Sequence, residues 1–213
     1  WAYLPGAPTT STESLVVVPV TLTLRLAGET ADATWPETVT LRRDAAGWRV
    51  ASEVSRGERT ALWDLGTLRV VTGRRSLVIG IDTSAATLRP YAATADRVVP
   101  QVTAVWGKGW SRYAVVIVPR TVGQLGRALG RSAASLDGYA AVTTAEGSSP
   151  HGAVAERVWV NTPAMAGLSS IGRQVVLRHE MTHVATAAPE HPDAPLWLVE
   201  GVAEWMGYRG SGI

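Results

Sequence analysis

The chain has 213 residues, of which 20 are basic and 18 acidic, so its formal net charge is only +2. The arginines are scattered and Lys108 is the single lysine, which leaves no basic stripe with interleaved aromatic residues. We therefore expect no nucleic-acid partner. No apolar run reaches the roughly 18 residues of a membrane span, so we expect none here.

The composition also limits the metal chemistry that the chain can support. There is no cysteine, which excludes disulfides and thiolate ligands. Any zinc site must therefore use histidine and carboxylate ligands. An apolar content of 46% is that of an ordinary protein with a core, and the length allows one large domain or two small ones.

The N-terminal part predicts a small β-rich module over residues 1–66. Residues 1–14 are rich in Pro, Thr and Ser and are expected to form a loose lead-in. Residues 16–26 alternate strictly between apolar and other side chains, which predicts a long half-buried strand. Residues 38–43 and 48–54 predict a hairpin, and residues 57–66 a junction to the next part.

The remainder, residues 67–213, mixes strands and helices and predicts an α+β domain. Strands are expected over 67–71, 76–81, 113–118, 139–143 and 157–161, and helices over 88–106, 122–129, 171–187 and 195–206. We expect the sheet to pack on the helix over 171–187.

That helix contains the pattern HExxH, formed by His179, Glu180 and His183 with two residues between. On a helix the two imidazoles share one face and can reach one zinc ion, while Glu180 points about 100° away toward a water. A polar stripe of Gln174, Arg178 and Thr182 predicts the solvent edge, so the histidines face the interior. The alternative is two core histidines hydrogen-bonded to backbone.

The last helix, over residues 195–206, is apolar except for Glu200 and Glu204, again four residues apart. Like charges at this spacing repel, and buried carboxylates are costly without a partner. A zinc ion bound by Glu200, with Glu204 accepting a hydrogen bond from a ligand imidazole, would resolve both problems. The alternative is a solvated glutamate pair, against which the flanking apolar residues argue.

The two motifs together resemble a known family. HExxH followed by Trp197-Leu198-x-Glu200-Gly201-x-Ala203-Glu204 is similar to the gluzincin metallopeptidases, which include thermolysin and the aminopeptidase-N-like enzymes. The resemblance covers about residues 171–208 and implies a minimal thermolysin-like peptidase domain. It implies that His179, His183 and Glu200 bind Zn²⁺ and that Glu180 is the general base. Glu204 would not bind the metal but would accept a hydrogen bond from a ligand imidazole.

The resemblance implies hydrolysis of peptide bonds in a peptide or protein substrate. It also implies a donor for the oxyanion, for which Tyr208, Tyr139 and His151 are candidates. A strand over 154–162 is expected at the sheet edge, where Trp159, Val160 and Asn161 would line the cleft and pair with an extended substrate. The alternative is a plain internal strand. This chain departs from the family pattern after Glu204. Only nine residues follow, whereas the family usually has a helical subdomain there.

Other parts of the chain leave wider alternatives. The N-terminal module resembles the strand part of the nuclear-transport-factor-2-like domains, in which a strand that ends in Gly-Trp-Arg-Val is common; here these residues are Gly47-Trp48-Arg49-Val50. We assign this module a scaffolding or docking role.

The chain starts at Trp1 without methionine, so we expect a fragment or processed form, in a secreted or membrane-tethered setting. A zinc-binding but catalytically silent module, or a structural domain without metal, remain alternatives; the oligomeric state is open.

Overall fold

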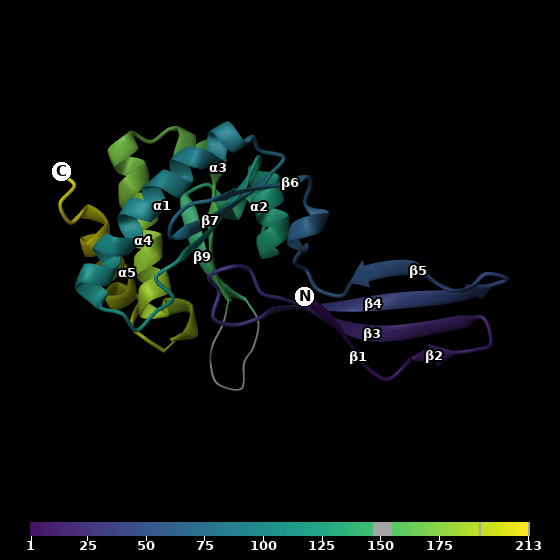
Figure 1. Ribbon diagram of the computed structural model, residues 1–213. Coiled ribbons are helices and arrows are strands. Elements are labelled where there is room, and N and C mark those ends of the chain that lie inside the picture. The colour runs from purple at the N-terminus through teal and green to yellow at the C-terminus, as the bar shows by residue number, and fades with distance from the viewer. Residues whose placement is uncertain (147–154, 192, 213) are drawn as a thin grey trace.

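The computed structural model describes residues 1–146, 155–191 and 193–212. Two five-stranded sheets organise these residues. The first extends as an arm from a body in which helices surround the second sheet (Figure 1). The predicted α+β class is confirmed.

The arm is an antiparallel sheet built from the first 55 residues. Its strands are β1 (Ala2–Pro5), β2 (Thr10–Ser11), β3 (Leu15–Leu24), β4 (Ala33–Asp44) and β5 (Gly47–Ser55). They follow the order β1-β3-β4-β5, with β2 also on β3. The predicted strand and hairpin are confirmed. The expected loose lead-in is wrong, because β1 and β2 both pair with β3.

Burial in the arm is confined to the end that meets the body. On β3, Val20 and Leu22 are buried, whereas the earlier valines of the same face are only partly covered. At the hairpin end Trp48 and Val50 are exposed. The alternating pattern therefore identifies the strand correctly, but half of its apolar face lies outside the core.

The sheet of the body is mixed and has the order β6-β7-β8-β10-β9. Its strands are β6 (Leu68–Thr72), β7 (Ser76–Ile81), β8 (Ala114–Pro119), β9 (Ala141–Glu146) and β10 (Ala155–Val160). The three inner strands are parallel, and the two outer ones run antiparallel to their neighbours. The inner strands are apolar almost throughout because both faces of the sheet are covered.

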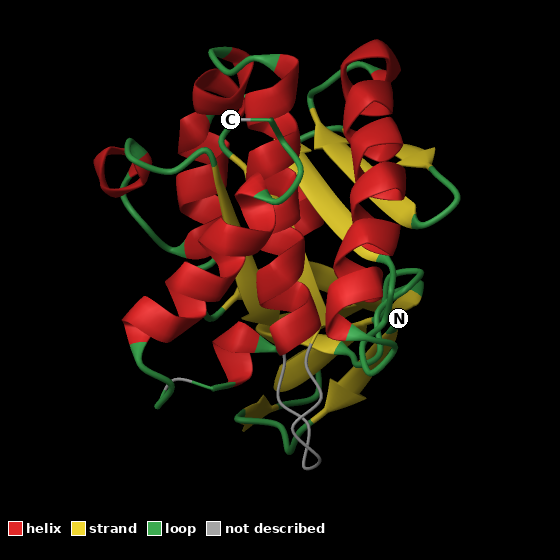
Figure 2. Cartoon of the chain, turned by 90° about the vertical axis from the view of Figure 1, so that its left-hand side faces the viewer, coloured by secondary structure: helices red, strands yellow, loops and turns green. Residues whose placement is uncertain are grey.

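Helices cover both faces of this sheet, and Figure 2 shows helices of one face in front of its strands. On one face lie α1 (Ala85–Trp106) and α4 (Ser170–Thr186), with α5 (Leu196–Tyr208) packed on α4; the other face carries α2 (Val122–Leu129). Shorter helical turns are η1 (Leu62–Asp64), η2 (Ala133–Leu136), α3 (Thr162–Ala166) and η3 (Ala188–Glu190). None of the helices in the described part of the chain is long and apolar enough to cross a bilayer.

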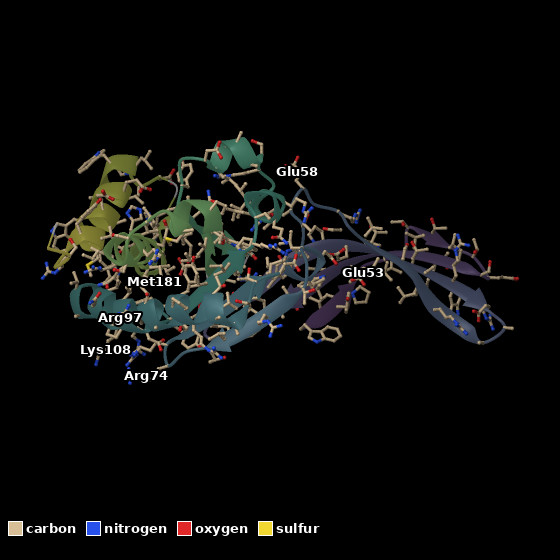
Figure 3. The ribbon with its side chains drawn as sticks, turned by 90° about the horizontal axis from the view of Figure 1, so that it is seen from above. Glu53, Glu58, Arg74, Arg97, Lys108 and Met181 are labelled. Atoms are coloured by element: carbon tan, nitrogen blue, oxygen red, sulfur yellow. The ribbon has the colours of Figure 1, made fainter. Side chains whose placement is uncertain are left out.

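Two of the three residues of the polar stripe of α4 do not face solvent, which corrects the sequence-based prediction; Gln174 is half-buried. Arg178 and Thr182 are buried, because α1, α5 and β9 all pack around α4. Arg178 donates from Nη1 to the backbone carbonyl of Arg209 at the end of α5. Thr182 donates to the carbonyl of Arg178 over 2.8 Å. Met181, which precedes Thr182 on α4, is also buried among the helices of the body. Figure 3 shows it there, far from Glu53 on the arm.

A buried ion network joins the arm to the body. The side chain of Arg157 on β10 is fully buried, and its Nε lies 2.6 Å from Oε1 of Glu29 in the β3–β4 connection. Its Nη1 lies 2.5 Å from Oε2 of Glu146, which also pairs with Arg59 over 2.7 Å. Removing one member would leave buried charges uncompensated, so the loss of any one of these side chains should destabilise the contact between the arm and the body.

Glu156, the residue before Arg157, is half-buried, and its carboxyl group has no such partner. Its Oε1 accepts no hydrogen bond within the described residues. Burial, reinforced by the nearby charge of Glu190, raises the pKa of Glu156 from 4.5 to about 8. The folded protein therefore keeps this proton over a pH range in which the unfolded chain has lost it.

We expect this difference to make Glu156 lower the stability as the pH rises. Between pH 4.5 and 8 the folded state binds more protons, so each pH unit lowers the free energy of unfolding by up to about 1.4 kcal/mol. Glu156→Gln removes this slope and is expected to be more stable than the wild type at pH 8. Urea unfolding of both proteins across the pH range measures the difference; parallel curves would contradict the assignment.

Candidate metal centre

Three potential ligand atoms from α4 and α5 lie close together. Nε2 of His179 is 3.0 Å from Nε2 of His183 and 3.3 Å from Oε2 of Glu200. His183 Nε2 lies 3.6 Å from the same oxygen. A tetrahedral zinc ion with bonds of about 2.0–2.1 Å separates its ligand atoms by about 3.3 Å. The three donors therefore form a group that could hold a metal ion, and their spacing is close to that of tetrahedral zinc ligands.

The local structure of α4 explains why the two imidazoles meet. The helix begins after Ser169, whose hydroxyl accepts a hydrogen bond from the backbone N–H of Gly172. His179 and His183 follow well inside the helix, one turn apart on the same face. Burial and the neighbouring His179 lower the pKa of His183. This favours its neutral form, which is the form that binds a metal.

Gly207 lets α5 approach α4 closely enough to complete the group. A Cβ atom at this position would lie 3.2 Å from the carbonyl oxygen of Val175 and 3.4 Å from Cβ of His179. These distances are at or below the tight end of normal contacts, so a side chain would push the helices apart. The glycine therefore helps to bring Glu200 to the two histidines.

Glu204, one turn after Glu200, faces the other nitrogen of His179. The distance from its Oε2 to Nδ1 of His179 is 3.3 Å. A carboxylate at this nitrogen favours the tautomer with the proton on Nδ1, which leaves Nε2 free to bind a metal. This is the position predicted for Glu204 from the sequence.

Both glutamates are nevertheless more exposed than expected, with side chains 50% and 61% accessible for Glu200 and Glu204. The flanking apolar residues do not bury them, because α5 contacts the body through a narrow stripe that includes Ala203 and Met206. Its outer face presents apolar side chains to solvent, namely Leu196, Trp197, Leu198, Trp205 and Tyr208. The argument from burial is thus wrong, whereas the proximity to the histidines holds.

Glu180 lies beside the three donors and is buried. Its Oε2 accepts a hydrogen bond of 2.7 Å from the hydroxyl of Thr143 on β9. Burial raises the pKa of Glu180, an effect that the Thr143 hydrogen bond and the charge of His179 oppose. A carboxyl group with a raised pKa beside three candidate metal ligands is suited to accept and return a proton.

A cavity of about 280 Å³ opens over this group. Its lining consists of the ligand face of α4, the start of β9, η3 and Val199 with Glu200 of α5: Tyr139, Ala141, Val142, Thr143, His179, Glu180, His183, Ala188, Pro189, Val199 and Glu200. Its walls are thus mostly apolar, and the titratable groups converge on one side. Apolar walls with a few convergent polar groups are common in small-molecule and substrate sites.

The strand at the edge of this cavity is β9, which corrects the prediction for the strand over 154–162. Within the described residues that strand is β10, an internal strand between β8 and β9. Trp159, Val160 and Asn161 are buried, and Asn161 donates to the carbonyl of Leu136. They cannot pair with a substrate, because β9 occupies the edge. Val154 lies outside the described residues.

The three candidate oxyanion donors differ in position. Tyr139 precedes β9 and lines the cavity. Tyr208 lies eight residues beyond Glu200, about 12 Å along the helix, and is not among the residues that line the cavity. His151 lies outside the described residues. Of the two described candidates, the structure thus brings only Tyr139 to the cavity.

Thr143 is the residue of the site that the sequence analysis missed. It falls in a predicted strand, 37 residues before Glu180, and nothing in its local pattern singles it out. The signal that could have found it is the mixed polarity of β9, Ala-Val-Thr-Thr-Ala-Glu, which is typical of a strand with one partly open side.

No protein-family model, curated protein or solved structure matches this chain. The functional assignment therefore depends on the geometry of the site and on the motif itself.

Proposed function

We propose that this chain is a zinc-dependent metallopeptidase of the gluzincin type. The observation that supports this most is the spacing of His179 Nε2, His183 Nε2 and Glu200 Oε2, with 3.0, 3.3 and 3.6 Å between the pairs. The three residues line one cavity together with Glu180, whose side chain is buried. Two histidines and one carboxylate are the donor set of catalytic zinc sites that keep a fourth position open.

In this proposal each residue has a separate task. His179, His183 and Glu200 would hold the ion, and Glu204 would orient the imidazole of His179. Zinc supplies, when bound, a lowered pKa for water and polarisation of the substrate carbonyl. Glu180 accepts the proton of the attacking water and delivers it to the leaving amine. The hydroxyl of Tyr139 is the proposed donor to the oxyanion.

The edge of β9 supports a peptide as the substrate. Asn161 donates its backbone N–H to the carbonyl of Ala140, so residues 140, 142 and 144 bond to β10 by the alternation of an antiparallel ladder. The N–H and C=O groups of Ala141 and Thr143 consequently point out of the sheet beside the cavity. An extended peptide can pair with them as an added strand.

Cleavage of a peptide library tests the proposal. We expect purified protein with one zinc per chain to cleave peptides, to lose the activity in a chelator, and to regain it with added zinc. Removal of the zinc accounts for the loss, since Glu180 without a metal has no activated water from which to take a proton. Zinc-loaded protein that cleaves no peptide of the library would contradict the peptidase assignment.

The outer face of α5 supports a second candidate function, a zinc-binding interaction module without catalysis. Leu196 and Trp197 are 73% and 76% exposed next to Glu200, an unusual amount of apolar surface beside a catalytic group. The same library distinguishes the two functions, because the module would bind zinc and cleave nothing.

A further inference from the structure

Thr143 links the edge strand of the cavity to the buried carboxyl group of Glu180. Its hydroxyl lies 2.7 Å from Oε2 of Glu180 and 3.1 Å from the backbone carbonyl of the same residue. A hydroxyl has one proton, and the shorter distance is the one to the carboxylate. Hydrogen bonds to ionised oxygens are also the stronger ones.

We propose that Thr143 is a positioning residue that holds one oxygen of Glu180 and directs the other toward the attacking water. This inference rests on the proposed peptidase function. Without such an anchor the glutamate side chain could take other staggered rotamers, since the cavity beside it is open. Catalysis by a general base depends on its position relative to the proton that it takes.

The same residue occupies the place where a substrate strand would pair. Its backbone N–H and C=O point to the open edge of β9, while its side chain points to α4. A peptide that pairs with β9 therefore lies at a fixed distance from the carboxylate of Glu180. Thr143 would thus position both reactants: its backbone pairs with the substrate, and its side chain holds the general base.

Thr143→Val tests the inference, because valine keeps the shape of threonine and loses the hydroxyl. We expect a kcat about 10–100-fold lower, with KM and zinc content unchanged. Thr143→Ser retains the hydroxyl and is expected to restore most of the rate. The matched control is Thr144→Val, on the opposite face of the same strand, because the hydroxyl of Thr144 is buried and bonds to no described residue.

Crystal structures of the zinc-loaded wild type and Thr143→Val give a readout that needs no activity. We expect the Glu180 carboxylate to lie against residue 143 in the wild type and in Thr143→Ser, and to leave this position in Thr143→Val. An unchanged Glu180 rotamer or an unchanged kcat in Thr143→Val overturns the inference. A zinc-loaded wild type that cleaves nothing overturns the proposed function instead, and the crystal structures still decide the position of Glu180.

Discussion

Replacing Glu180 with glutamine is expected to lower kcat by at least about 10²-fold while the protein still binds one zinc ion per chain. Glutamine has nearly the same shape but cannot accept a proton from water. Glu180 is not among the three donors, so the metal group remains complete. Steady-state hydrolysis of a cleaved peptide, measured together with zinc content, separates the two effects.

Glu58→Gln is the matched control for this substitution. Glu58 is exposed in the junction between the arm and the body, away from the helices that carry the donors (Figure 3). It should leave both rate and zinc content at the wild-type level. Hydrolysis by Glu180→Gln at the wild-type rate would show that another group acts as the base.

Loss of one metal ligand is expected to have the second large effect. Glu200→Ala removes the single carboxylate of the donor group and leaves two imidazoles, so we expect zinc to be lost on dialysis against a weak chelator. Glu204→Gln keeps all three donors and changes only the partner of His179 Nδ1. We expect about 10–100-fold weaker zinc binding for this variant, with one ion still bound at saturation.

Competition titration with a chromophoric chelator measures both affinities. The order of affinity should be wild type, then Glu204→Gln, then Glu200→Ala. Equal affinity of Glu200→Ala and the wild type would remove Glu200 from the site. The three-donor geometry would then have to be explained by hydrogen bonding between the helices.

The two helices of the site could be predicted from the sequence because their information is local. A spacing of four residues places His179 and His183, or Glu200 and Glu204, on one helical face whatever surrounds them. That the two pairs lie together could be predicted only from the resemblance of the combined motifs to the gluzincin pattern. The structure adds the physical condition, which is the close approach at Gly207.

The strand at the cavity could not be predicted in this way, because strand order is not a local property. The buried run of β10 and the mixed run of β9 both predict strands, but only the sheet shows which one lies at the edge. The prediction that Arg178 faces solvent was wrong for a related reason. An arginine indicates solvent by its hydropathy, yet here it satisfies a carbonyl at the end of α5 inside the protein.

The outer face of α5 shows a third limit. A helix that is apolar nearly all round predicts burial, but the sequence does not tell which side is covered. Trp197 and Trp205 lie on the exposed side, whereas Ala203 and Met206 face α4. The prediction of a buried glutamate pair failed because it assumed cover on every side.

The measurement that tests the metal centre most directly is a crystal structure of zinc-soaked protein, with anomalous diffraction recorded at the zinc edge. We expect one strong anomalous peak about 2.0–2.2 Å from Nε2 of His179, Nε2 of His183 and a carboxylate oxygen of Glu200. Such a peak would place the metal in the cavity beside Glu180. A peak elsewhere, or no peak between these three atoms in fully soaked crystals, would contradict the zinc site and the function built on it.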